Sequence, residues 1–449
     1  MSNSDIRAGH DLTVGSEYQH LMRLTGFMLL GLVAVMSANL IEALYIGKVG
    51  TKELAALGFT FPVVMGLHGM MMGLGIGASS VVARSIGGGE WRRAKALITH
   101  SFVLVLAFVA LITLLMILFL IDIFTALGAT GEILDMSVGY MRAYLIGFPF
   151  FAIAMVGSTL MRAAGDAVKP GYLMVVGAAL QVALGPIFIF GLFGFSEMGL
   201  EGAAIAFVVA RTFSFLMYVY FVYKDDLLVF DLKNFWGSSK DIMHVGLPAI
   251  LSNIIGPVSM SVITRLLAGH GAVVVAGFSV ASRIETMFAM FMWALSMSVA
   301  PFVGQNWGAQ HFKRVTRSLR LGNFFALAWG VFSYLTLIVL GPFVISLVNS
   351  DLEVIDAATV YLMIAPLGMG LMGVMANCMS SFNALGQPGP PFIMSLCQMI
   401  FLSIPFAIIG DYFFGYHGIF AGGVLSILII AVISYAWLKR NIRIGSLSK

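Results

Sequence analysis

The chain has 449 residues, of which 60% are hydrophobic and 10% are charged, and its formal net charge is +4 at pH 7. A soluble globular domain carries about 25% charged residues, so this composition excludes a protein whose whole surface faces water. The charges include no block of lysine and arginine. We therefore expect no nucleic-acid partner and a lipid bilayer as the surroundings of the chain.

Residues 1–20 are polar and mixed in charge, and they lack the basic start, apolar core and cleavage site of a signal peptide. A transmembrane helix needs about 20 mostly apolar residues, and about a dozen such runs follow. Their expected ranges are 22–46, 54–83, 98–121, 134–161, 171–194, 199–223, 244–268, 272–303, 321–347, 355–381, 391–413 and 417–438. The runs are too long and too apolar for alternating strands, so the sequence predicts an all-α integral membrane protein of about 12 transmembrane helices.

Basic residues alternate between the two sides of these spans. Those that follow the second, fourth, sixth, eighth and twelfth spans are Arg84, Arg92, Arg93, Lys95, Arg162, Lys169, Lys224, Lys233, Lys240, Lys313, Arg314, Arg317, Arg320, Lys439, Arg440, Arg443 and Lys449. The other set of loops holds only Lys48, Lys52 and Arg265. Because basic loops stay in the cytoplasm, we expect both termini to be cytoplasmic, in a multi-pass protein of the cell inner (plasma) membrane.

The sequence also repeats itself at one constant offset, the one that takes position 50 to position 271. The matching pairs are Gly50 and Gly271, Gly87 and Gly308, Arg93 and Arg314, Tyr140 and Tyr361, Gly147 and Gly368, Ala163 and Ala384, Gly165 and Gly386, and Pro170 and Pro391. Since each half holds an even number of spans, the two copies have the same orientation, which makes a parallel repeat. The pattern predicts two pseudo-symmetric six-helix lobes, and lobes that rock against each other are typical of a transporter.

The domain boundaries follow from the spans and the polar stretches between them. The polar stretch from Lys224-Asp-Asp to Gly237-Ser-Ser-Lys-Asp lies between the halves. We expect a polar cytoplasmic N-terminus at 1–20, an N-lobe with helices 1–6 at 21–223, a cytoplasmic linker at 224–242, a C-lobe with helices 7–12 at 243–440, and a cytoplasmic tail at 441–449.

Glu42 is the residue that we expect to carry ion coupling. It lies deep in the first span, where a carboxylate is costly and usually faces a cavity or a partner. Asn39 and Tyr45 lie three residues on either side of it and share its helical face, so they can hydrogen-bond the carboxyl group or help to coordinate a cation. The alternative is that Glu42 lies near the membrane surface and is merely solvated there.

Four further polar residues are candidates for a cavity between the helices. His68, inside the second span, is more often an interhelical hydrogen bonder than a proton relay, and Gln181 is expected first in the same role. Arg283 and Glu285 open the eighth span, but two residues apart they do not face each other on one helix. A structural ion pair with other helices and a role in transport both stay open for them.

Signatures of other chemistries are missing from the sequence. It contains no G-x-x-x-x-G-K-[ST] loop for ATP, no H-E-x-x-H motif and no G-x-S-x-G with a plausible triad, so we expect no enzyme activity. Cys378 and Cys397 lie in apolar runs without metal-ligand spacing, and we expect no metal site and no cofactor beyond a coupling ion, H+ or Na+. Arg142 and Arg211 are assigned to span ends, where they would extend to the membrane surface or pair with another group.

Three tracts resemble a known family. They are Glu42-Ala-Leu-Tyr-Ile-Gly-Lys-Val-Gly50, Arg162-Ala-Ala-Gly-Asp-Ala-Val-Lys-Pro170 and Val303-Gly-Gln-Asn-Trp-Gly-Ala309. On these tracts nearly the whole chain is similar to the multidrug and toxic compound extrusion (MATE) transporters, in the multidrug/oligosaccharidyl-lipid/polysaccharide flippase superfamily. The resemblance implies efflux of amphipathic, often cationic compounds in exchange for H+ or Na+, with Glu42 taking part in coupling.

The chain departs from the family pattern at several positions. Glu42 stands where the family usually has Asp. One bacterial branch carries Asn and Asp four residues apart in the fifth span, where this chain has Gln181 and Gly185, and another has an acid in the seventh span, where this chain has Gly256. A proline common early in the first span is missing near Thr25. Whether Gln181 and Gly185 replace the fifth-span ion site, and which ion is used, stay open.

We therefore expect a cation-coupled antiporter that exports small organic compounds by alternating access and works as a monomer. One alternative is a lipid-linked precursor flippase of the same superfamily, which predicts a large cationic central cavity. The other is a non-transporting membrane receptor, which would leave both the internal repeat and Glu42 unexplained.

Overall fold

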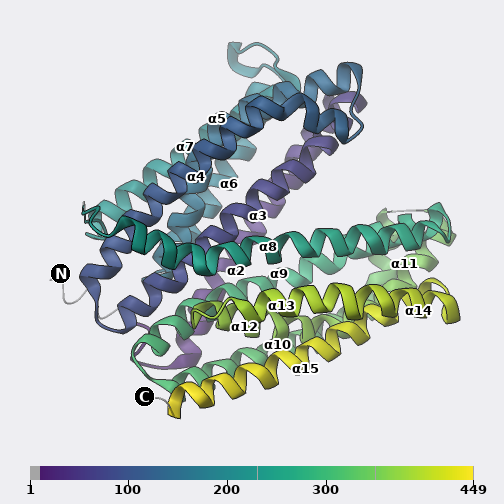
Figure 1. The fold of residues 1–449 in the computed structure, drawn as a ribbon. Helices are drawn as coiled ribbons and strands as arrows, with labels where there is room; N and C mark the ends of the chain where they lie inside the picture. Colours follow the sequence, from purple (N-terminus) through teal and green to yellow (C-terminus); the bar gives the residue numbers. More distant parts are fainter. Residues whose placement is uncertain (1–10, 230, 349, 448–449) are drawn as a thin grey trace. The chain divides into compact units, whose positions relative to one another are not determined.

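The computed structural model describes residues 11–229, 231–348 and 350–447, and these ranges form helices without a β-strand (Figure 1). The longer helices are α2 (Glu17–Val49), α3 (Thr51–Gly87), α4 (Trp91–Ala126), α5 (Gly131–Ala163), α6 (Val168–Ile189), α7 (Gly199–Lys224), α8 (Phe235–Ala268), α9 (Ala272–Gly308), α10 (Phe312–Val348), α11 (Leu352–Ile364), α12 (Met369–Ala384), α13 (Gly389–Cys397), α14 (Ile404–Phe414) and α15 (Tyr416–Leu447). Within the described ranges, 12 helical segments are long and apolar enough to cross a membrane. The predicted all-α membrane fold is confirmed.

Two of these spans change helix type where proline interrupts them. α11 passes into α12 through the 3-10 helix η2 (Ala365–Gly368), which contains Pro366. α13 passes into α14 through the π-helical segment η3 (Gln398–Ser403), directly before the turn that holds Pro405. Proline has no backbone N–H and clashes with the preceding turn, and local 3-10 or π geometry in membrane helices satisfies the carbonyl groups that it leaves free. A third short helix, η1 (Leu192–Gly194), follows α6.

The internal repeat is visible in the helix bounds. The offset that relates Gly50 to Gly271 also carries both ends of α3 onto the ends of α9, and both ends of α5 onto the ends of the span made by α11 and α12. The same offset carries the start of α4 onto the start of α10. Each half of the sequence therefore folds into the same succession of spans, as the repeated residues predict.

Packing divides the chain into two compact units. The N-unit comprises Gly26–Ser85 and Glu90–Gly246, and the C-unit comprises the described residues of Met1–Thr25, Ile86–Gly89 and Leu247–Lys449. α8 begins at Phe235, inside the range 224–242 that is expected from the sequence to be a linker. The start of α8 therefore belongs to the N-unit, and the start of α2 belongs to the C-unit.

In the N-unit, α5 packs against α4 and α7, and α7 also packs against α6 (Figure 1). α2 approaches α6 closely, because a Cβ atom added at Gly171 of α6 would lie 2.6 Å from the carbonyl oxygen of Phe27 on α2. Small residues permit such close backbone approach between membrane helices. Glycine at position 171 thus permits the close approach of the two helices that carry Glu42 and Gln181.

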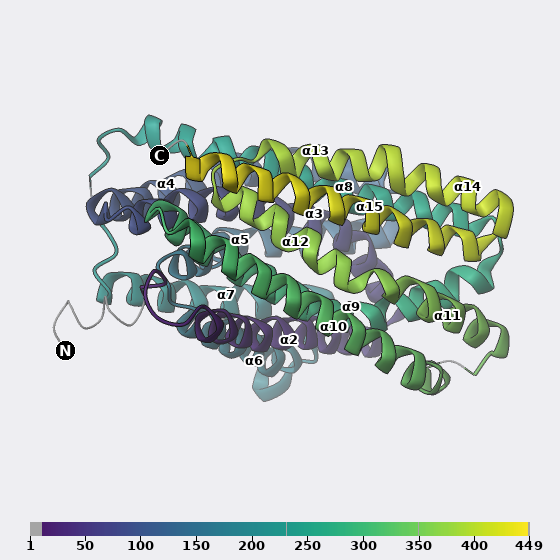
Figure 2. The same ribbon diagram turned by 90° about the horizontal axis from the view of Figure 1, so that it is seen from below.

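In the C-unit, α9 packs against α10, α11 and α12, and α15 packs against α14 and α12 (Figure 2). The indole Nε1 of Trp329 on α10 donates to the carbonyl oxygen of Phe288 on α9 at 2.9 Å. The segment before α2 joins this unit through Leu12, which is buried and whose N–H donates to Oε1 of Gln305 at 3.0 Å. The start of the described chain is therefore part of the C-unit core.

Candidate functional site

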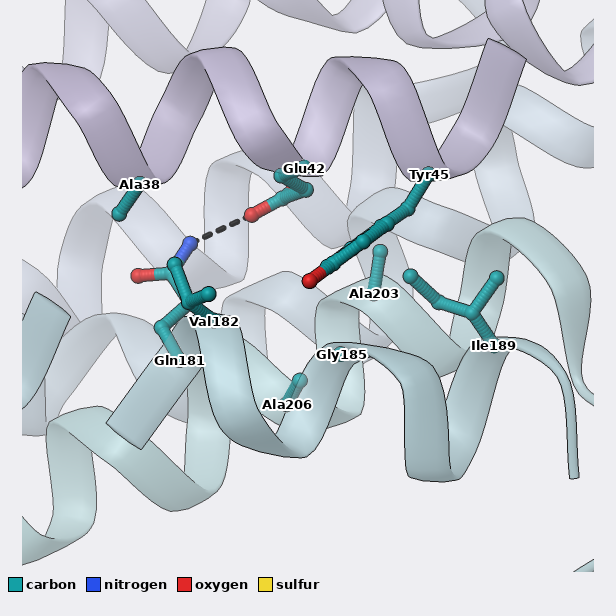
Figure 3. A pocket seen from close by; sticks show the side chains of 9 residues that line it. All are labelled: Ala38, Glu42, Tyr45, Gln181, Val182, Gly185, Ile189, Ala203 and Ala206. Atoms are coloured by element: carbon teal, nitrogen blue, oxygen red, sulfur yellow. Dashed lines mark hydrogen bonds between the residues drawn. The ribbon is translucent and has the colours of Figure 1, made fainter. Parts of the chain in front are cut away.

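Glu42 lies on α2 in the N-unit and faces α6. Its carboxylate Oε2 accepts a hydrogen bond from the amide Nε2 of Gln181 (Figure 3). Glu42 is half-buried within the N-unit, and Gln181 is only 5% exposed. The carboxylate therefore sits against a buried polar partner on the neighbouring helix.

Gln181 connects Glu42 to a half-buried cation. Its carbonyl oxygen Oε1 accepts a hydrogen bond from Nη2 of Arg211 on α7 at 2.9 Å. The Arg211 guanidinium lies 5.1 Å from the ring centroid of Phe207 and 5.8 Å from that of Phe151. Such distances are within the range of cation–π attraction, so two aromatic rings and one amide hold the guanidinium inside the N-unit.

A small pocket adjoins the carboxylate between α2, α6 and α7. It is lined by Ala38, Glu42, Tyr45, Gln181, Val182, Gly185, Ile189, Ala203 and Ala206 (Figure 3). Its free volume is about 10 Å³, about what one water molecule occupies. The free space beside the carboxylate therefore has the size of an ion or a water molecule. Small residues help to create this space, since four of the nine lining residues are alanine or glycine.

Tyr45 and Gly185 shape the far end of the pocket. A Cβ atom at Gly185 would lie 3.1 Å from the Tyr45 ring, closer than ordinary van der Waals contact, so the absence of a side chain on α6 makes room for the phenol. Figure 3 shows the Tyr45 side chain extending from α2 across the pocket. The Tyr45 ring therefore lies in the space that a side chain at position 185 would occupy.

His68 belongs to the same polar interior of the N-unit. Its Nε2 and the hydroxyl of Tyr144 on α5 are hydrogen-bonded at 2.8 Å, and its ring stacks on Phe151 at 4.3 Å. Tyr144 in turn stacks on Phe207 at 4.4 Å, the ring that lies under Arg211. Polar and aromatic contacts thus run without a gap from α3 through α5 and α7 to the site around Glu42.

The remaining predicted residues lie elsewhere. Asn39 is exposed on α2 and is not among the residues that line the pocket. Arg283, in the C-unit, is also exposed. Glu285 on α9 is half-buried and accepts a hydrogen bond from the hydroxyl of Tyr361 on α11. The structure thus brings Glu42, Tyr45 and Gln181 together, with His68 close by, and keeps Arg283 and Glu285 in the other unit.

The repeat relates the Glu285–Tyr361 pair to the His68–Tyr144 pair. In the first copy of the repeat, the positions equivalent to Glu285 and Tyr361 are Val64 and Tyr140, each one helical turn before His68 and Tyr144. Both units therefore tie their second span to their fourth span through a polar pair with a tyrosine on the fourth. The two pairs sit one turn apart in the two copies.

Arg211 is the site residue that the sequence analysis missed. The expectation that it lies near a span end is wrong, because α7 runs from Gly199 to Lys224 and Arg211 lies in its middle. The predicted span 199–223 already contained this signal, since a charged residue at the centre of a span marks a function or a partner. Arg142, assigned with it, is exposed on α5. Within the described ranges, no group of three or more His, Cys, Asp or Glu side chains could hold a metal ion.

The helices and the site together define a class of protein. The described residues form twelve apolar spans, several of them with bounds that recur at the offset of the repeat, and they hold a carboxylate in a pocket between helices. Both are features of multi-pass secondary transporters. The chain belongs to the MatE family, whose family model matches residues 28–187 and 248–409. One matched segment lies in each half of the sequence, so the model matches once in each copy of the repeat. The resemblance to MATE transporters drawn from the sequence motifs is confirmed.

Known relatives are similar over nearly the whole chain. The chain is 28% identical to an FAD transporter of Shewanella oneidensis over 416 residues, covering 92% of both chains. It is 24% identical to the probable multidrug resistance protein YoeA of Bacillus subtilis, covering 92% of this chain and 93% of that one. Among solved structures, the Vibrio cholerae MATE transporter VcmN in the bent form matches with a TM-score of 0.92 and 29% identity, covering 96% of this chain and 98% of that one. The Shewanella and Vibrio relatives are named as transporters, and the Bacillus relative is named for multidrug resistance.

Proposed function

We propose that the protein is a cation-coupled antiporter that exports amphipathic organic compounds from the cytoplasm by alternating access. Glu42 is the group that binds the coupling ion, H+ or Na+. The observation that carries the proposal is the Glu42 carboxylate itself, withdrawn into an apolar span and bonded to Gln181 beside a pocket of ionic size. A charge in such a place is costly and is retained where an ion or proton passes.

The ion drives transport through its preference for one arrangement of the protein. A ligand shifts a conformational equilibrium only by its difference in affinity for the two states. A cation that binds to Glu42 from outside changes the charge at the contact between α2 and α6. The cation then either competes with the substrate for the carboxylate or changes the packing of α2. Release of substrate outside and of the cation inside completes the exchange.

The relatives bear on the choice of substrate. The Shewanella relative is named for FAD, which is an anionic aromatic compound, and the Bacillus relative is named for multidrug resistance. A transport panel for this chain therefore needs an organic cation and FAD side by side. No observation on this chain favours a lipid-linked precursor. We place the protein in the plasma membrane with cytoplasmic termini, acting as a monomer.

The proposal is tested by ion-driven uptake into proteoliposomes that contain the full chain. The substrates are a fluorescent organic cation and FAD, and either a proton or a Na+ gradient is imposed. Uptake by the Glu42→Gln protein is expected to fall to the level of protein-free liposomes. The matched control is Glu132→Gln, which makes the same change at a carboxylate that is 58% exposed and pairs with Lys52. The control should transport like the original chain. Full gradient-driven uptake by the Glu42→Gln protein would refute the proposal.

A further inference from the structure

We propose that Arg211 makes the Glu42 site selective for a proton over Na+, by fixing which end of the Gln181 amide faces Glu42. The inference rests on the proposed function and deepens it, since it names the coupling ion of the same site. Arg211 does not touch the ion. It is a positioning residue that acts through Gln181.

The first step is the orientation of the amide. A guanidinium has only donors, and an ionised carboxylate has only acceptors. With Arg211 on one side and Glu42 on the other, the carbonyl oxygen of Gln181 must face Arg211 and its NH2 group must face Glu42, as the two hydrogen bonds show. A turn of the amide would oppose donor to donor and acceptor to acceptor, so this orientation is the one that satisfies both neighbours.

The second step is the supply of oxygen ligands. Hard cations are held by several oxygen atoms from carboxylates, carbonyls or waters. In this pocket Gln181 presents N–H in place of its carbonyl oxygen, which is taken by Arg211. The side-chain oxygens left are those of Glu42 and the phenol of Tyr45, because the other lining residues are alanine, valine, isoleucine or glycine. A Na+ ion therefore meets too few ligands, whereas a proton needs only one carboxylate oxygen.

The third step is the charge already present. The titratable and charged groups that face Glu42 are Arg211 on α7 and Tyr140 and Tyr144 on α5, and His68 on α3 lies near Arg211. Arg211 is the permanent cation among these groups. It offsets the carboxylate charge across Gln181 and so disfavours any further cation, H+ and Na+ alike; the difference between the two ions lies in the oxygen ligands that each needs. A proton removes the negative charge by forming an O–H bond and leaves the other carboxylate oxygen to accept from Gln181.

The test compares the drives of the two ions in the full chain and in two variants. Arg211→Met keeps a long apolar side chain against Phe207 and Phe151 but frees the Gln181 carbonyl oxygen to turn toward Glu42. Arg211→Lys keeps a donor-only cation and is the matched control. Proteoliposomes in choline-balanced buffer receive either a pH gradient alone or a Na+ gradient alone. The initial rate of uptake of the organic cation or of FAD is measured, and the pH dependence of this rate is recorded with and without Na+.

We expect the original chain and Arg211→Lys to respond to the pH gradient and not to Na+. In Arg211→Met the ratio of the Na+-driven to the proton-driven rate should rise about tenfold or more, the scale set by one charge-assisted hydrogen bond. Added Na+ should also shift the pH dependence of the uptake rate in the Arg211→Met protein and leave the pH dependence of the original chain unchanged.

Several outcomes would overturn the inference. Uptake by the original chain on a Na+ gradient at constant pH would do so while leaving the proposed antiport intact. An Arg211→Met protein that gains no Na+ response would do the same. If neither Arg211 variant gives monodisperse protein, Arg211 is a structural residue and the inference falls. Absence of any ion-driven uptake by the original chain would instead refute the proposed function itself.

Discussion

Replacing Arg314 tests how the start of the chain is held in the C-unit. Arg314 donates from Nε to Oδ1 of Asn306 at 2.9 Å, from Nη1 to the carbonyl oxygen of Gly15 at 2.9 Å and from Nη2 to that of Leu12 at 3.3 Å. Its guanidinium also lies 3.7 Å from the carboxylate of Glu17. One side chain thus fastens the residues before α2 to α9 and α10.

The cost of Arg314→Gln follows from these contacts. A hydrogen bond from a charged group contributes about 1.5 to 3 kcal/mol, and an exposed ion pair about 1 kcal/mol or less. The side chain of Arg314 is 21% exposed, and the bond to Leu12 is long, so we count only part of the sum. The free energy that opens the segment around Leu12 should fall by about 2 to 4 kcal/mol, which is roughly 30- to 700-fold in an opening equilibrium.

Hydrogen–deuterium exchange of the peptide that contains Leu12 and Gly15 measures this opening directly. The matched control is Arg317→Gln, because Arg317 also approaches Glu17, at 3.8 Å, but its side chain is 77% exposed. We expect the control to change exchange by about twofold or less. Equal exchange in the two variants would refute the reasoning, because it would mean that the hydrogen bonds of Arg314 stabilise the segment around Leu12 no more than the exposed contact of Arg317 does.

Two further changes probe the helix contacts of each unit. Gly171→Ala places a Cβ atom 2.6 Å from the carbonyl oxygen of Phe27, so we expect α2 to move away from α6 and ion-driven uptake to fall. Gly58→Ala is the control, because a Cβ atom there meets nothing within 4 Å, and this variant should transport normally. Equal uptake rates in the two variants would contradict the close approach of α2 and α6. Tyr361→Phe removes the donor to Glu285 and should lower the melting temperature of the purified protein by about 2 to 6 °C. Tyr412→Phe, at a residue that is 84% exposed, should leave it unchanged, and a similar loss in both would show that the Glu285 bond is not the cause.

The spans were predictable because the bilayer imposes a length and a composition on them. The bounds were less so: α2 begins at Glu17 and α8 at Phe235, where the predicted spans begin at 22 and 244. Backbone hydrogen bonding continues past the apolar run, and hydropathy detects only the run. The change of helix type around Pro366 had a sequence signal in the proline, but its form depends on which neighbours satisfy the freed carbonyls.

The site was predictable only in part. Glu42 was predicted because a carboxylate in an apolar span is rare. Tyr45 was predicted because residues three positions apart lie on the same face of a helix. Asn39 obeys the same spacing rule but is exposed, since the rotation of α2 is set by where α6 packs, and spacing does not give that. The partnership of Arg211 with Gln181 joins two helices, and no pattern within either helix encodes it.

The starts of α2 and α8 are exchanged between the two units, and the exchange follows the repeat. The C-unit takes in the chain up to Thr25 and the N-unit takes it in up to Gly246, and these are equivalent positions in the two copies of the repeat. In the N-unit, His100 is the counterpart of the Arg314 anchor in role: its Nδ1 bonds the hydroxyl of Ser238 and its Nε2 bonds the carbonyl oxygen of Asp231, both at 2.8 Å. The first helix of each half therefore begins as part of the other unit's core. α2 is thus one continuous helix that begins in the C-unit and carries Glu42 in the N-unit.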